Sequence, residues 1–125
     1  MPVGFDKDIF VATLNANALP PFGGGVCAKH VRLALQAAGV NTTGNPVSAK
    51  NYGPFLRKLG FSVVSPAGYV PQPGDIAVIQ GTSKSKAGHI EGFDGTNWVS
   101  DFIQKEFWPG PSYRTEKPSF EIFRS

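Results

Sequence analysis

Residues 23–32, GGGVCAKHVR, decide the fold, because a glycine-rich loop runs there into a predicted helix. Apolar residues recur along the following segment and Gly39 supplies a C-terminal stop, which predicts a helix over 26–38. Its many alanines and leucines indicate burial on more than one face. Cys27, the single cysteine of the chain, would begin this helix. The positive end of the helix dipole and the unpaired N–H groups there favour a thiolate and can stabilise an oxyanion.

Two interpretations of Cys27 compete. Most free cysteines are small buried hydrophobic residues without chemistry. Three glycines directly before Val26 and Cys27, however, allow a substrate to approach the backbone closely. We therefore interpret Cys27 as a nucleophile and expect Gly25 and Val26 to border the oxyanion site and the substrate groove.

A nucleophilic thiol needs a base, and His89 in AGHIE (87–91) is the candidate. The segment reads as a strand, and Gly88 leaves room beside the ring, so Gly88 is also expected to line the groove. From this position His89 can take the thiol proton and later protonate a leaving amine. His30 competes, but it stands one turn along the helix of Cys27 and is more typical of a packing or surface residue.

The base also needs a third group to fix its tautomer and orientation. The candidates are Asp94, Glu91 and Asp101. Asp94 fits better as the first residue of an Asp-Gly hairpin turn, and Glu91 shares the face of His89 two residues along the strand. Folding about residues 94–96 would place Asp101 approximately opposite His89, where a ring-to-carboxylate hydrogen bond is within reach. We therefore predict Asp101 in this role.

The whole sequence predicts one α+β domain over residues 1–125, with N-terminal helices packed on a C-terminal antiparallel sheet of about five strands. The first helix is expected over 6–17 with Asp6 as its cap, and a third from 48 or 51 to 59. The predicted strands are 61–64, 75–79, 88–93, 97–102 and 120–123.

Two turn-rich segments flank the predicted strands. Pro71–Asp75 starts a strand from a rigid turn, and Asp75 is expected to tie that turn through backbone N–H groups. The segment 107–114 is aromatic and rich in proline and glycine. It is read either as a wall of a substrate groove, with Trp108 in contact with substrate, or as a loop packed over the sheet edge.

Composition limits the class of protein. The chain has 125 residues, 41% hydrophobic residues and a net charge of +3, which fits a folded domain and is too weak a charge to argue for nucleic acid. One cysteine excludes an intramolecular disulfide, and one cysteine with two histidines makes no zinc-like cluster. No signal peptide and no apolar run of the roughly 20 residues of a membrane span is visible. We expect synthesis in the cytoplasm without membrane insertion, and a specialised route if the chain acts outside.

At this point the chain resembles a known group. The helix motif at Cys27, the segment PGDIAV (73–78) and the segment GHI (88–90) look like the NlpC/P60 and CHAP group of papain-like peptidoglycan hydrolases. The further spacing to Asp101 is similar to the Cys-His-Asp amidase effectors of type VI secretion systems. The chain departs from many CHAP domains, which place an acidic residue followed by asparagine after the histidine, where Asp101 and Gln104 stand here.

The resemblance implies a papain-like fold and cleavage of an amide bond in the stem peptides or crosslinks of bacterial peptidoglycan. Cys27 would be the nucleophile, His89 the base and Asp101 the orienting residue, with no metal or cofactor. It also implies action in the periplasm or cell wall of a target cell, after secretion or phage-type lysis, and a cognate immunity protein if the chain is a toxin. A thiol-dependent deamidase or acyltransferase toxin and a non-catalytic wall-binding module remain the alternatives.

Overall fold

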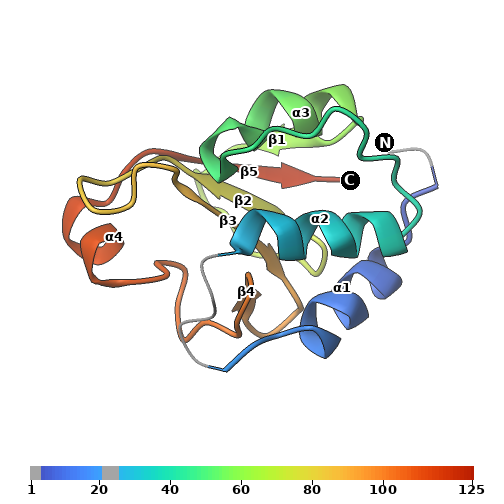
Figure 1. Cartoon of the computed structure of the whole chain (residues 1–125), viewed down its shortest axis with the longest axis horizontal. Coiled ribbons are helices and arrows are strands. Elements are labelled where there is room, and N and C mark those ends of the chain that lie inside the picture. The colour runs from blue at the N-terminus through green and yellow to red at the C-terminus, as the bar shows by residue number, and fades with distance from the viewer. Residues whose placement is uncertain (1–3, 21–25) are drawn as a thin grey trace.

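The computed structural model describes residues 4–20 and 26–125. Figure 1 shows helices and a sheet in an α+β arrangement, as predicted. The helices are α1 (Lys7–Ala16), α2 (Cys27–Ala37), the short 3₁₀ helix η1 (Ala49–Asn51), α3 (Tyr52–Lys58) and α4 (Pro111–Glu116). The strands are β1 (Ser62–Val64), β2 (Ile76–Ile79), β3 (His89–Phe93), β4 (Trp98–Val99) and β5 (Phe120–Arg124).

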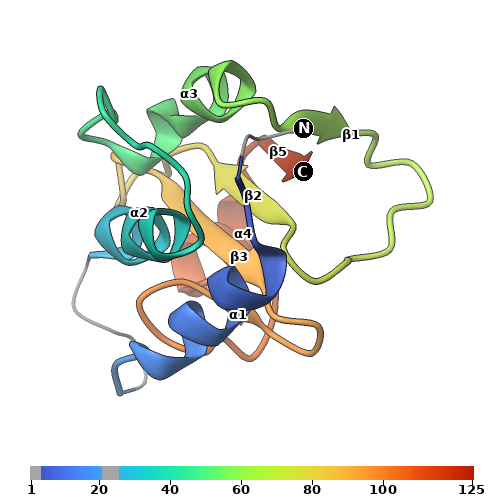
Figure 2. The same cartoon turned by 90° about the vertical axis from the view of Figure 1, so that its right-hand side faces the viewer.

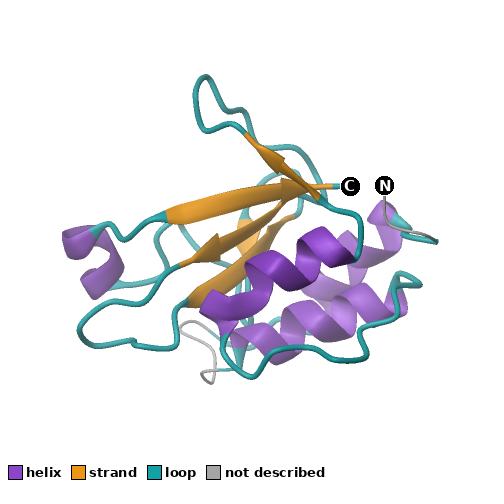
Figure 3. Cartoon of the chain, turned by 90° about the horizontal axis from the view of Figure 1, so that it is seen from above, coloured by secondary structure: helices purple, strands orange, loops and turns teal. Residues whose placement is uncertain are grey.

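Within the described part of the chain the strands form one five-stranded sheet in the order β1-β5-β2-β3-β4, and every paired neighbour is antiparallel. Helices α1, α2 and α3 cover one face of this sheet (Figure 3). Helices α1 and α2 lie side by side, and α2 packs on β3 (Figure 2). Helix α4 lies apart from them, beside the loop that joins β2 and β3.

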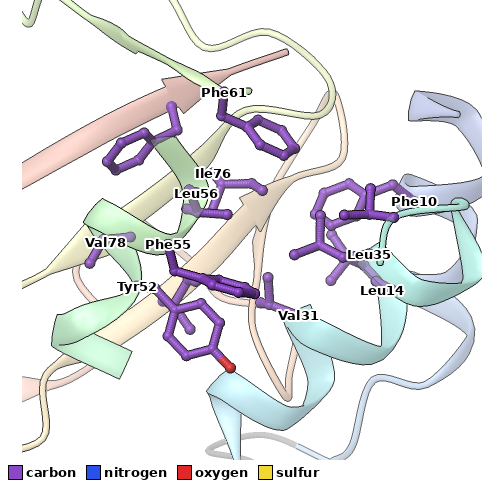
Figure 4. Close-up of a cluster of buried hydrophobic side chains, with 14 of the residues drawn as sticks. Phe10, Leu14, Val31, Leu35, Tyr52, Phe55, Leu56, Phe61, Ile76 and Val78 are labelled. Carbon is purple, nitrogen blue, oxygen red and sulfur yellow. The ribbon is translucent and has the colours of Figure 1, made fainter. Parts of the chain in front are cut away.

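The main core fills the space between these helices and the sheet (Figure 4). Strand β2 shows how the sheet divides its side chains: Ile76 and Val78 enter this core, whereas Ala77 packs with Trp98 and Ile122 on the other face. Burial of this apolar surface is the main stabilising contribution to the fold. The labelled core residues in Figure 4 are Phe10, Leu14, Val31, Leu35, Tyr52, Phe55, Leu56, Phe61, Ile76 and Val78.

The ends of the predicted helices are confirmed. Asp6 caps α1, since its Oδ1 accepts the N–H of Ile9 at 3.1 Å. Gly39 follows the end of α2 with a φ of +97°, and a Cβ there would lie 2.6 Å from the carbonyl oxygen of Gly4. Glycine is therefore required at this stop for both conformation and space.

The turn before β2 is held as expected, with an additional contact from the C-terminal strand. Asp75 is fully buried and accepts the N–H of Gln72 at 2.9 Å and the hydroxyl of Tyr69 at 2.7 Å. It also pairs with Arg124, whose Nε lies 2.8 Å from Oδ1. Asp75 thus links the start of β2 to the end of β5.

Two elements differ from the predictions. Residues 97–102 were expected as one strand, but β4 ends at Val99 and the chain turns back, so that Val99 forms a bridge with Ile103. The segment 107–114 was expected as a groove wall or as a loop over the sheet edge, and no helix was predicted there, yet Pro111 begins the short helix α4. Proline is favoured at a first helical position because it has no N–H to leave unsatisfied there.

Candidate active site

Cys27 is the first residue of α2, and its side chain is half-buried against the core. Val26 precedes it and provides no side-chain cap in the described structure. Instead the backbone N–H of Val26 donates to Asp101 Oδ2 at 3.1 Å. The helix therefore presents its first-turn amides at the position where the thiol stands.

Packing of α2 on β3 brings His89 to Cys27, as the sequence predicts. The His89 side chain and the backbone N–H of Ile90 both lie close enough to the sulfur to favour its ionised form. Burial alone would raise the pKa of the thiol, but the hydrogen bond and positive charge of His89 outweigh burial and lower it below 9.0. The site thus favours a thiolate.

The other side of the His89 ring meets two buried polar groups. Nε2 lies 2.8 Å from Gln104 Oε1 and 3.2 Å from Glu91 Oε1, and Gln104 Nε2 donates to the same Glu91 oxygen at 2.9 Å. Because Nε2 faces these groups, Nδ1 is the ring nitrogen left for the thiol. The ring is therefore held between Cys27 and a Gln104–Glu91 pair.

This environment raises the pKa of His89 to about 10. Burial on its own would lower that pKa, but the hydrogen bonds to Cys27 and Glu91 and the negative charge of Glu91 outweigh it. Glu91 is completely buried, and burial raises its own pKa despite the opposing contacts with His89 and Gln104. Its Oε2 has no hydrogen-bond partner among the described residues.

Asp101 reaches the site from another direction than the sequence predicts. The expected register placed it opposite His89 to within one residue, and the pairing of Gly92 with Val99 keeps to that range, but β4 stops at Val99. Asp101 nonetheless lines the cleft of Cys27 and His89, where it binds Val26 and its negative charge opposes ionisation of the thiol.

The remaining histidine and aspartate candidates have structural positions. The ring nitrogens of His30 lie 3.3 Å from the carbonyl oxygen of Val26 and 3.1 Å from that of Asn17, so His30 links α2 to the end of α1. Asp94 Oδ1 accepts the N–H groups of Thr96 and Asn97 and closes the predicted hairpin.

A cleft of about 690 Å³ opens above Cys27 and His89. Val26 and Gly88 line it as expected, and Gly25 lies outside the described residues. Trp108 borders an adjoining hollow that shares Phe102 and Pro109 with the cleft, and its ring packs on Phe107 and Phe120. Its contact with substrate stays a prediction. Phe102 and the α4 residue Tyr113 are aromatic residues of the cleft, and the ring centre of Tyr113 lies 5.9 Å from that of His89.

The sequence assigns no individual role to two residues of the site. Gln104 is visible there only as a departure from the CHAP pattern, and Tyr113 lies in the segment 107–114, whose alternative prediction as a groove wall agrees with its place in the cleft. No local motif marks either residue. Tyr113 is set beside His89 by α4, and Gln104 by the turn after β4, where its backbone N–H donates to Trp98.

Across residues 4–20 and 26–125, no group of three or more His, Cys, Asp or Glu side chains is placed to hold a metal ion. No helix in the same ranges is both long enough and apolar enough to cross a membrane.

The chain is similar to one chain in the crystal structure of the type VI native effector-immunity complex Tae3-Tai3 from Ralstonia pickettii. The two share 34% sequence identity with a TM-score of 0.87 over 96% of this chain and 98% of that chain. The chain belongs to the family of the type VI effector Tae3. The selenomethionine structure of the same Tae3 complex matches at 35% identity and a TM-score of 0.85, covering 92% of this chain and 98% of that chain.

Membership of the Tae3 family confirms the resemblance to type VI effectors. A scan against protein-family models and a search of curated proteins both find no match. The NlpC/P60 and CHAP part of the resemblance therefore stays a prediction.

Proposed function

We propose that this chain is a cysteine hydrolase that cleaves an amide bond in the stem peptides or crosslinks of bacterial peptidoglycan. One observation carries the proposal: a half-buried thiol at a helix N-terminus lies beside His89, and Gln104 and Glu91 contact Nε2 on the other side of that ring. The kinship with a type VI effector supports an antibacterial role. The order of a helix-borne cysteine followed by a strand-borne histidine also supports a papain-like fold, formed by one catalytic domain over residues 1–125.

Acylation begins from the Cys27 thiolate and the protonated His89 ring. The sulfur attacks the amide carbonyl carbon, a C–S bond forms, and the carbonyl electrons move to the oxygen. The backbone N–H of Cys27 and a neighbouring loop donor stabilise that oxyanion, because the Val26 N–H is already bonded to Asp101. When the C–N bond breaks, His89 gives its proton to the departing amine.

Deacylation uses the same groups in reverse. Neutral His89 takes a proton from water, and the hydroxide oxygen attacks the thioester carbon. The C–S bond breaks, the carboxyl product leaves, and the thiolate is restored beside protonated His89. No metal or cofactor enters either step, so we expect the rate to be unaffected by a chelator.

The orienting role expected of Asp101 passes, in this proposal, to Gln104 and Glu91. Both lie within hydrogen-bond distance of His89 Nε2, and both are buried, so the ring is held in one orientation. Asp101 is proposed to fix the start of α2 through Val26. The triad of the sequence prediction thus becomes Cys27, His89 and a Gln104–Glu91 pair.

The family suggests a protein partner and a route of secretion for this chain. The similar structures are effector-immunity complexes, which supports a cognate immunity protein that binds this chain. We propose delivery by a type VI apparatus to the cell wall of a target cell.

The test is digestion of purified peptidoglycan by the wild type and by Cys27→Ala, with the released fragments identified by mass spectrometry. We expect fragments from the wild type alone, with masses that identify the bond. An intact wall together with a highly reactive thiol would contradict the proposal and favour a deamidase or acyltransferase. An intact wall with an unreactive thiol would favour a binding module.

A further inference from the structure

The cleft above Cys27 carries an excess of positive charge. Lys29 and Arg32 of α2 line it from one side, and Lys86, in the loop between β2 and β3, lines it from another. Among the described lining residues Asp101 is the one acidic group, and its Oδ2 already accepts the N–H of Val26. The cleft therefore favours an anionic ligand.

Among the described residues, these three cations lack the ion pairs that two arginines form elsewhere in the fold. Arg57 forms an ion pair with Glu121, and Arg124 forms one with Asp75. Within residues 4–20 and 26–125, Lys29, Arg32 and Lys86 form no ion pair. Arg32 is also half-buried, so part of its hydration is already lost. A guanidinium in this state is well suited to a carboxylate, whose two oxygens match its fork of donors.

We propose that Arg32, with Lys29 and Lys86, forms a carboxylate-binding subsite that takes a free carboxylate of the substrate peptide. This inference rests on the proposed function and names the feature of the substrate that the cleft recognises. It distinguishes a stem peptide with free carboxylates from the same peptide with those groups amidated.

The helix sets the distance between this subsite and the reacting bond. Arg32 follows Cys27 by five residues, which is about 7.5 Å along the axis of α2 at 1.5 Å per residue. An extended peptide advances about 3.3–3.6 Å per residue. Since the arginine side chain adds its own reach to this axial spacing, we expect the recognised carboxylate within a few residues of the scissile amide.

Binding is measured with the full chain carrying Cys27→Ala, which prevents turnover. The probes are a synthetic stem peptide with free carboxylates and its amidated twin, titrated by calorimetry. We expect the free peptide to bind at least roughly tenfold more tightly, since hydrogen bonds to charged groups are worth about 1.5–3 kcal/mol. Added Arg32→Gln should remove most of that difference and Lys86→Gln part of it. Added Lys58→Gln, an exposed charge on α3 outside this cleft, should retain it.

Equal binding of both peptides, binding of neither, or an unchanged preference in folded Arg32→Gln would overturn the subsite. Tighter binding of a single-stranded oligonucleotide than of the free peptide would overturn it in favour of phosphate recognition. Measuring cleavage of both peptides by the chain with Cys27 intact distinguishes a failure of this inference from a failure of the proposed function. Selective binding without cleavage would retain the subsite and reject the hydrolase, whereas cleavage of both peptides with equal kcat/KM would do the reverse.

Discussion

The imidazole of His89 lies between a half-buried thiol and a fully buried carboxylate. Cys27 and His89 could be predicted from the sequence, because a thiol after a glycine-rich loop and a histidine in a strand each carry a local signal. Gln104 could not, since a turn after β4 brings it to the ring and no spacing rule describes that turn. The site thus combines two predictable residues with a buried pair that only the fold assembles.

Replacing Gln104 tests that pair. Gln104→Leu removes the acceptor 2.8 Å from His89 Nε2 and the donor to Glu91, so the ring loses its fixed orientation. We expect kcat on peptidoglycan fragments to fall roughly 10²-fold, the cost of misplacing a catalytic group by a small distance. We also expect the pH dependence of thiol alkylation to shift, which a purely structural role would leave in place. Gln72→Leu, an exposed position outside the cleft, is the control, and an unchanged kcat in folded Gln104→Leu would refute the assignment.

Asp101 affects the pKa of the Cys27 thiol in the opposite direction from His89. Its negative charge raises the pKa of the Cys27 thiol, so Asp101→Asn should lower that pKa further. The rate of alkylation by iodoacetamide, followed against pH, measures the change. A higher thiol pKa in the variant would show that Asp101 acts instead by stabilising the protonated ring, as the sequence predicts.

The order of helices and strands could be predicted, but the short helix α4 and the extent of β4 could not. Asp6, Gly39 and the Asp94-Gly95 turn carry the conformational preferences that set element ends, and each does so in the structure. Strand β4 is shorter than predicted, because only Trp98 and Val99 pair in it. So short a strand carries too little alternation to fix which face each side chain takes.

Gly88, directly before β3, leaves little room for an added side chain. Its φ is +74°, and a Cβ there would lie 2.5 Å from the carbonyl oxygen of Ile79 and 2.7 Å from Cβ of Lys50. We expect Gly88→Ala to reduce the free energy of unfolding by about 2 kcal/mol or more, measured by urea denaturation. Gly110→Ala is the matched control, because Gly110 is extended and has open space around it. Equal stability of the two variants would contradict this account of the loop.

At the scale of the molecule, the cleft is assembled from segments far apart in the chain. Helix α2, residues 47–49, residues 85–89 and residues 109–113 all line it. Composition indicates only a mild positive charge of +3, and does not reveal that three cations gather around one thiol. The fold brings these three basic side chains, which are separated in the sequence, to one cleft.

Expression in the periplasm and in the cytoplasm of the same host tests whether the cell wall is the target. Directed to the periplasm of a Gram-negative host by an added signal peptide, the chain should lyse the culture, because the proposed substrate, peptidoglycan, lies there. Retained in the cytoplasm, it should leave growth unchanged. Optical density after induction gives the readout, and periplasmic Cys27→Ala is the control. Toxicity in the cytoplasm alone would point to a protein or lipid substrate.

The measurement that tests the central claim most directly is the pH profile of Cys27 alkylation in the wild type and in His89→Gln. We expect the wild-type thiol to ionise with a pKa below 9.0, because the protonated His89 ring, whose pKa is about 10, stabilises the thiolate. In His89→Gln the profile should move to higher pH, since burial then acts without the compensating charge. Identical profiles in both proteins, titrating near the ordinary thiol value of 9.0, would contradict the Cys27–His89 pair.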